Sequence, residues 1–164
     1  MQALQVAAAV GQILTGFGTL VLLYIAAVTT VRSKRADILM ECHRRFSELQ
    51  VRKGQTTQKA DAEKFFQSFW SSQFDQFGYW QQGFIDDTTF KYWMDSRQRE
   101  FLQTSLEVCG TPYLTGWHDV RGTWAGTDFI DFVNLIETRD PRTAMDQFRP
   151  RGFQKWILRK LAGN

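Results

Sequence analysis

The residues able to do chemistry are few in this chain, and their spacing argues against a catalytic site. Histidine occurs only at His43 and His118, and cysteine only at Cys42 and Cys109. His118 precedes Asp119 in a turn-rich stretch, but adjacency along a chain does not create the imidazole–carboxylate pair of a general base. The cysteines lack the CxxC spacing of a zinc site. We therefore expect no metal site, and an enzyme centred on His118 is the weakest alternative left open.

The sequence also lacks the catalytic motifs of the large enzyme classes. The sequence holds no HExxH, GxxxxGK[ST], GxSxG or Rossmann glycine pattern. Residues 54–140 carry 13 carboxylates, which are typical of solubilising charge on polar helix faces, and His43 beside Arg44 is typical of a solvated side chain. We predict a protein that is not an enzyme, with no catalytic residue and no cofactor.

The composition is that of a folded chain rich in aromatic residues. Of 164 residues, 43% are hydrophobic and 23% are charged, which allows a packed core and excludes wholesale disorder. The mean hydropathy of −0.34 excludes a protein with many membrane spans. The 14 Phe, 6 Trp and 4 Tyr residues exceed ordinary usage, so aromatic packing is expected to dominate the core.

Charge divides the chain into four segments, which we take as its domain organisation. Residues 1–31 carry no charged side chain, residues 32–53 a net charge of +4, residues 54–140 of −6 and residues 141–164 of +5. We interpret them as a transmembrane anchor, a basic juxtamembrane helix, an acidic, aromatic-rich helical domain and a basic amphipathic C-terminal helix. Because the net charge of +3 comes from two basic ends around an acidic middle, we expect no nucleic-acid partner.

The first segment predicts a single membrane span. Residues 7–31 carry no charge, and as a helix they are about 37 Å long, enough to cross a hydrocarbon layer of about 30 Å with some tilt. A cleaved signal peptide is a competing interpretation, because small residues recur at Ala26 and Ala27, and a buried helix of a soluble protein is another. The length of the run and the lack of basic residues before it favour the span.

The basic residues next to the span predict its orientation. Arg32, Lys34 and Arg35 follow the span directly, whereas only the chain's own amino group precedes it. The positive-inside rule then places residues 32–164 in the cytoplasm and the N-terminus outside. Two reduced cysteines agree with a cytosolic domain, and a Cys42–Cys109 disulfide is the alternative for the inverted topology.

Within the span, small and polar residues form a stripe at helical spacing. Gly11, Thr15 and Gly18 occupy positions i, i+4 and i+7, and Gln12 lies beside them. Small residues let a second helix approach closely in lipid, and Gln12 could form a hydrogen bond across that contact. Gly and Thr are also common in membrane helices that have no such role, so both interpretations stay open.

The cytoplasmic part predicts helices only. Apolar residues recur every three or four positions in five stretches, residues 33–53, 62–82, 88–108, 127–137 and 152–161. Asp61 and either Asp86 or Asp87 are the predicted N-caps, Pro141 ends the fourth stretch, and residues 110–126 are predicted as turns. No run alternates for long enough to predict a strand. The expected fold is all-α, with one N-terminal transmembrane helix followed by a small aromatic-rich helical bundle.

A stripe of aromatic residues dominates the helix predicted at residues 62–82. At a spacing of three or four positions it comprises Phe66, Trp70, Phe74, Phe77 and Trp80. With its aromatic neighbours this face is wider than one helix needs to dock on a small bundle. It is typical of a core of large side chains in a small domain, and part of it could also contact a partner protein or a lipid-like ligand. The two interpretations are compatible.

The helix predicted at residues 152–161 also has two interpretations. It presents apolar and basic residues on different faces, Phe153, Trp156 and Leu161 on one and Lys155, Arg159 and Lys160 around the other. This pattern is typical of a helix lying on anionic lipid headgroups, where the basic residues after the span would lie too. It is equally typical of a terminal helix that closes a bundle.

The central segment resembles an uncharacterised bacterial family of small single-pass membrane proteins with a cytoplasmic helical domain. Residues 65–101 are similar to its pattern F-W, Q-F, W, G-x-I-D and W-M-x-x-R. The matching residues are Phe69-Trp70, Gln73-Phe74, Trp80, Gly83, Ile85-Asp86, Trp93-Met94 and Arg97. The resemblance implies a bacterial source and a membrane-anchored helical domain, hence an inner membrane crossed once, and it implies no activity.

Two functions of different classes remain. The first is a non-catalytic accessory or scaffold subunit that packs against a larger integral membrane protein complex, whether respiratory, photosynthetic or transport. The small-residue stripe, the extra aromatic surface and the missing catalytic set favour it. The second is a membrane-anchored signalling or stress-response effector that acts through self-association of the span.

Overall fold

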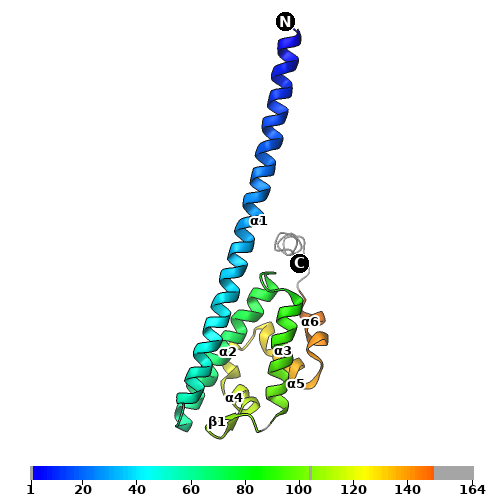
Figure 1. Cartoon of the computed structure of the whole chain (residues 1–164). Helices are drawn as coiled ribbons and strands as arrows, with labels where there is room; N and C mark the ends of the chain where they lie inside the picture. Colours follow the sequence, from blue (N-terminus) through cyan, green and yellow to red (C-terminus); the bar gives the residue numbers. More distant parts are fainter. Residues whose placement is uncertain (1, 104, 150–164) are drawn as a thin grey trace.

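The computed structural model describes residues 2–103 and 105–149, with side-chain surroundings given for Gln12 and from residue 15 onward (Figure 1). In this part of the chain the fold is all-α, with one long N-terminal helix followed by a bundle of shorter helices. The long helix, α1, spans Gln2–Gln55. The other elements are α2 (Lys59–Gln81), α3 (Asp87–Leu102), β1 (Glu107–Val108), β2 (Thr111–Pro112), α4 (Tyr113–Val120), the 3₁₀-helix η1 (Arg121–Trp124), α5 (Asp128–Thr138) and α6 (Pro141–Phe148).

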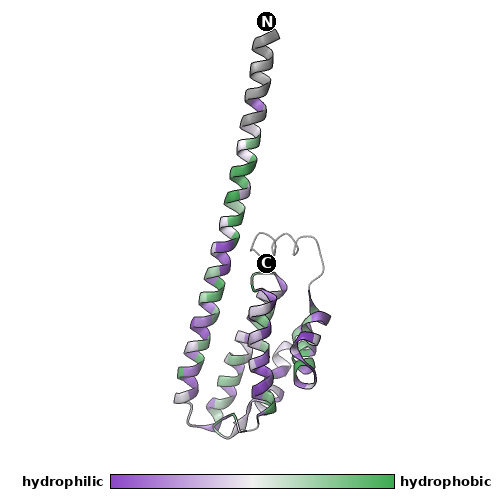
Figure 2. Cartoon of the chain, turned by 45° about the vertical axis from the view of Figure 1, so that its right-hand side comes forward, coloured by the Kyte–Doolittle hydropathy of each residue, from purple (hydrophilic) through white to green (hydrophobic). Residues whose placement is uncertain are grey.

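Helix α1 passes through two environments without a break. Its N-terminal half projects alone and its C-terminal half lies along the bundle, as Figures 1 and 2 show. At about 1.5 Å per residue, its 54 residues are about 81 Å long. No proline occurs before Pro112, and the helix ends just after Gly54. The helix predicted at residues 33–53 is therefore confirmed as the direct continuation of the apolar stretch.

Helix α2 returns along α1 in the antiparallel direction. Three polar contacts join the two in inverse sequence order, Arg52 to Ser68 at 3.0 Å, Arg45 to Asp75 at 2.6 Å, and Arg35 to Asp86 just after α2. Between them Ile38, Cys42 and Leu49 of α1 are buried in the core. The turn between α2 and α3 therefore lies beside Arg35. Arg35 follows the uncharged part of α1, residues 2–31, which we call its apolar half.

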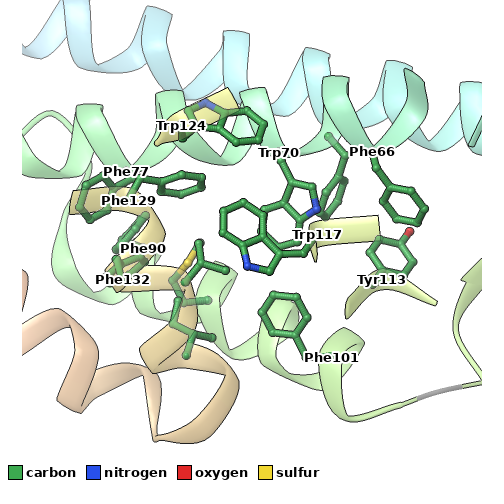
Figure 3. Close-up of a cluster of buried hydrophobic side chains, with 14 of the residues drawn as sticks. Phe66, Trp70, Phe77, Phe90, Phe101, Tyr113, Trp117, Trp124, Phe129 and Phe132 are labelled. Carbon is green, nitrogen blue, oxygen red and sulfur yellow. The ribbon is translucent and has the colours of Figure 1, made fainter. Parts of the chain in front are cut away.

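Aromatic side chains from α2, α3, α4, η1 and α5 form one continuous core (Figure 3). The ring centroids of Trp70 and Trp117 are 4.7 Å apart, and Trp80 stacks on Phe90 at the same distance. Trp80, Phe90 and Trp117 are fully buried. Because each such ring removes about 150–250 Å² from water, these side chains can build a core in a small domain.

Gly116 allows α4 to approach α2 closely. A Cβ atom at this position would lie 2.4 Å from the ring of Phe66, which is itself buried. Residues 110–126 were predicted as turns, in part because of their glycines. The structure corrects this prediction, because Gly116 lies inside α4 and serves a close contact between helices.

The start of α2 and the end of α3 differ from the sequence prediction. Helix α2 begins at Lys59 with Gln58 at its N-cap, so the predicted cap Asp61 lies inside its first turn. Helix α3 starts after its N-cap Asp86, one of the two predicted caps, and ends at Leu102. The chain then forms an antiparallel pair of two-residue strands, too short to give an alternating pattern.

The last two described helices confirm one prediction and correct another. Helix α5 buries the predicted face, Phe129, Phe132, Val133 and Ile136. Pro141 follows the end of α5 but also opens α6, which the sequence did not predict. Proline suits the first helical position because no intrahelical hydrogen bond needs its missing N–H, and the Asp140 side chain accepts a hydrogen bond from the Arg142 N–H at 2.8 Å.

Candidate functional sites

The apolar half of α1 is the first candidate site. Every side chain from residue 15 to residue 27 is exposed, and Phe17, Leu20 and Leu22 are 66–68% exposed. In the described part of the chain, α1 is the one helix long and apolar enough to span a membrane, and it lies near the N-terminus. A surface that is apolar all round requires lipid or another protein around it.

The predicted small-residue stripe lies on this half. Gln12, Thr15 and Gly18 are exposed, and the surroundings of Gly11 lie outside the described residues. A Cβ atom on Gly18 would meet no atom of the described chain within 4 Å. The hydroxyl of Thr19 donates to the carbonyl of Thr15 at 2.9 Å, so the helix itself satisfies this polar group. The stripe is an open face, and its contact with another helix stays a prediction.

The basic residues after the apolar half hold the bundle against α1. Arg35 pairs with Asp86, whose side chain also accepts hydrogen bonds from the N–H and hydroxyl of Thr89. The Lys34 Nζ lies 5.2 Å from the ring centroid of Phe84. Burial acts to raise the pKa of Asp86, but the Thr89 hydrogen bonds and the Arg35 charge outweigh it, so this pKa lies below its usual value. The ionised form of Asp86 is the one that holds this junction.

The remaining predicted membrane-surface residues are only partly described. Arg32 is exposed at the end of the apolar half of α1, and Lys155, Arg159 and Lys160 lie outside the described residues. Just before that segment, the Arg149 Nη2 lies 3.1 Å from the Asp87 Oδ2. Because Asp87 follows the turn beside Arg35, Arg149 lies at the same end of the bundle as Arg35.

The aromatic stripe of α2 lies inside the domain. Phe66, Trp70, Phe77 and Trp80 are at most 4% exposed, and Phe74 is half-buried. Their rings already contact aromatic rings of α3, α4 and α5. The interpretation of the stripe as the core of the domain is therefore confirmed for these four buried residues. Contact of the half-buried Phe74 with a partner or a lipid-like ligand stays a prediction.

The histidines and cysteines form no metal cluster or disulfide among the described residues. His118 and Asp119 are both exposed on α4. Cys42 and Cys109 are free thiols, and burial raises the pKa of Cys42 to about 11, so this thiol is protonated at neutral pH. The Cys109 thiol donates to the Thr56 carbonyl at 2.8 Å. Among the residues that the structure describes, no three His, Cys, Asp or Glu side chains gather as a metal site would require.

A polar group that sequence reasoning missed lies between α1, α2 and α3. Arg97 of α3 is 6% exposed, and its guanidinium carbon lies 5.4 Å from the ring centroid of Phe46 and 5.0 Å from that of Phe69. Its Nη1 atom is 3.0 Å from the Oε2 of Glu100. Burial lowers the pKa of Arg97 and raises that of Glu100. The one signal in the sequence was the place of Arg97 in the W-M-x-x-R pattern, which gave it no role.

No family model matches this chain, and no curated protein or solved structure is significantly similar to it. The resemblance of residues 65–101 to a bacterial membrane protein family therefore stays a prediction.

Proposed function

We propose that the protein is a non-catalytic accessory or scaffold subunit of a larger membrane protein complex in a bacterial inner membrane. It crosses the membrane once, with the N-terminus outside and the bundle in the cytoplasm. One observation carries the proposal: α1 is a single continuous helix whose apolar half is exposed and whose basic half is part of the bundle. A partner bound to the apolar half is therefore connected to the domain through a rigid rod.

The small-residue stripe supports a partner helix over a simple anchor. An anchor needs only apolar side chains, whereas this span carries Gly11, Gln12, Thr15 and Gly18 on one face. Helices in lipid associate by close packing at small residues and by polar contacts, because burial from water supplies no driving force there. The open surface at Gly18 leaves room for such an approach.

The basic residues support an orientation with the bundle against the inner leaflet. Arg32 and Lys34 are exposed directly after the apolar half of α1, and Arg149, the last described residue, contacts Asp87 at the same end of the bundle. Anionic lipid headgroups attract such clusters. We include these headgroups among the partners, with Lys155, Arg159 and Lys160 as the C-terminal contribution.

Two glycine variants test the proposal. Gly18→Leu adds bulk to the stripe, and Gly16→Leu adds the same bulk about 200° away around the helix, at a position equally free of contacts. Each full-length protein is purified in mild detergent from bacterial membranes, and its partners are identified by mass spectrometry. We expect stoichiometric co-purification with a membrane complex for the unchanged protein and for Gly16→Leu, and loss of the complex for Gly18→Leu.

Other outcomes would point elsewhere. A homo-oligomer without another protein, disrupted by Gly18→Leu alone, would support the alternative of a signalling or stress-response effector that acts by self-association. A C-terminal green fluorescent protein fusion checks the topology, because this reporter fluoresces when it folds in the cytoplasm. A dark fusion of normal abundance would contradict the proposed orientation.

A further inference from the structure

A cavity between α1, α2 and α3 plays no part in the proposed function. It has a volume of about 300 Å³ and is lined by residues of all three helices. Two lining residues, His43 and Tyr92, are exposed, so the cavity can be reached from solvent. Such a volume is much larger than one water molecule occupies and falls at the lower end of the range for small-molecule sites.

Arg97 is the lining residue whose burial demands an explanation. Its Nε and Nη1 atoms have no hydrogen-bond partner within the described residues. Nη1 lies near the Oε2 of Glu100, but this oxygen also lacks a hydrogen bond, so the two charges are close without being well aligned. A buried charge with incomplete hydrogen bonding costs stability. An anion bound beside the guanidinium would offset that cost.

The other polar groups of the wall suit an anion. Gln73 and Gln76 of α2 are 3% and 4% exposed, and the Oε1 atom of Gln73 has no hydrogen-bond partner in the described chain. A glutamine amide can present N–H donors as well as its oxygen. The lining includes the cationic Arg97 and no carboxylate; Glu100, whose Oε2 lies 3.0 Å from the Arg97 Nη1, is outside the lining and forms no hydrogen bond with it. The unused N–H donors at this wall therefore suit an acceptor such as a carboxylate.

The rest of the lining is largely apolar. The cavity is also lined by Cys42 and Phe46 of α1 and by Trp93 of α3, and all three are buried or half-buried. Aromatic walls with a few convergent polar groups are typical of sites for small organic ligands. The burial that raises the pKa of Cys42 also makes this thiol a poor nucleophile, which favours binding over covalent chemistry.

We propose that this cavity binds a small organic carboxylate with an apolar or aromatic body. The carboxylate lies against Arg97, since a guanidinium matches its two oxygens with parallel N–H donors, and the body lies against Phe46 and Trp93. Because α1 supplies one wall, the bound ligand joins the membrane-anchored helix to α2 and α3. The site thus adds ligand binding to a domain proposed only as a scaffold.

Protection of Cys42 from alkylation tests this site in the full-length protein in neutral detergent. A Cys109→Ser background leaves Cys42 as the only thiol. The probes are benzoate, 4-phenylbutyrate and octanoate, each beside its primary amide, and inorganic phosphate. Because the buried Cys42 thiol reacts slowly, N-ethylmaleimide is used in large excess and the reaction rate is followed by intact mass over hours. We expect at least one carboxylate to slow it by about tenfold at about ten times its Kd, because only the free protein reacts, while amides and phosphate leave it unchanged.

Three variants separate the site from general effects on folding. Arg97→Gln removes the charge and weakens carboxylate protection by about tenfold. Ser96→Leu fills the cavity and keeps Arg97, so it decides the matter if Arg97→Gln does not fold. Ser71→Leu is its control, the same change at a half-buried serine outside this cavity. Every rate is taken relative to the ligand-free rate of the same variant.

The contrary results are equally clear. Any of three results would overturn the proposal. None of the three carboxylates protects Cys42, or the amides or phosphate protect it equally, or Ser96→Leu leaves the protection unchanged. None of these results depends on whether the span binds a membrane complex, so the two proposals can fail separately.

Discussion

The two halves of α1 share one backbone and differ in what surrounds their apolar side chains. From residue 15 to residue 27 every side chain is exposed, and nearly all of them are apolar or small. In the second half, charged residues separate the few apolar ones, and Ile38, Cys42 and Leu49 are buried in the bundle. The helical geometry is the same in both. The spacing of apolar residues differs, and this spacing decides whether the helix needs lipid all round or a domain on one side.

The two halves of α1 also differ in the charge that they carry. Glu41 pairs with both Arg44 and Arg45 on the exposed side of the second half, and these arginines hold its pKa down at about 2. Such ionised pairs keep one face in water while the other packs on α2. The first half has no charged residue to oppose lipid. Substitutions that change packing or charge should therefore have different effects in the two halves.

The largest effect is expected from truncating a buried leucine of α1. Leu49→Ala removes a side chain that is 5% exposed, and loss of packing should reduce the free energy of unfolding of the bundle by about 2–5 kcal/mol. Leu23→Ala makes the same change at 61% exposure and should alter it by less than about 0.5 kcal/mol. Urea unfolding in neutral detergent measures both through tryptophan fluorescence, because all six tryptophans follow α1. Equal effects would contradict the distinction between the halves.

A charge placed in the apolar half should come next. Leu20→Arg puts a guanidinium inside the proposed span and should oppose insertion by about 2.5–3.5 kcal/mol. Met40→Arg is the matched control, because both side chains are 66% exposed but Met40 lies in the second half of α1, beyond the proposed span. The measurement is the membrane fraction that resists carbonate extraction. The span is disproved if Leu20→Arg and Met40→Arg remain equally resistant.

An added methyl group should distinguish tight from open packing at glycine. Gly116→Ala forces a Cβ atom against the buried Phe66 ring and should cost about 1–3 kcal/mol of unfolding free energy. Gly18→Ala meets nothing within 4 Å and should be neutral or slightly stabilising, since alanine favours helix. The same urea titrations measure the two variants. A neutral Gly116→Ala would mean that α2 and α4 can separate without cost.

The smallest effect is expected where the bundle meets the end of the apolar half. Asp86→Ala removes both the N-cap of α3 and the partner of Arg35, and should cost about 0.5–2 kcal/mol. Asp86→Asn keeps a capping oxygen and loses only the charge, so it should cost less. Asp61→Ala is the control, because Asp61 lies in the first turn of α2 and caps nothing.

Acid should remove the contribution of the Asp86 carboxylate to the free energy of unfolding. The pKa of Asp86 is lower in the folded protein than in the unfolded chain, so its stabilising effect is complete above the unfolded value, about 4, and is lost as the pH falls through the folded value. The unchanged protein and Asp86→Asn should therefore differ most near neutral pH and converge in acid. A difference that persists unchanged below pH of about 2 would rule out the carboxylate charge as its cause.

Local sequence was sufficient for the helices whose apolar residues have a regular period. Residues 127–137 predicted both α5 and its buried face, because each apolar position there recurs every three or four residues. It was insufficient around Gly116 and Pro141. Both residues are typical of helix breaks, but one permits a close contact inside α4 and the other occupies the first position of α6.

The aromatic stripe and the Arg97 cavity show the same limit at the candidate sites. The spacing of Phe66 and Trp70 fixed a helix face, but could not say whether a partner or the chain itself covers it. Arg97 lies at the wall of a cavity only because Phe46 of α1 and Gln73 of α2, far away in sequence, line the same cavity. No period within α3 carries that information.

By itself, then, the sequence determined the all-α class, the uncharged N-terminal stretch and the helices with a clear apolar period. These depend on hydropathy and backbone propensity, which act between neighbours along the chain. Only the tertiary structure decided which faces are buried, where α2 returns along α1, and that a cation lies at the wall of a cavity. Burial depends on which segments meet in space, and the contacts that exclude water here join residues tens of positions apart.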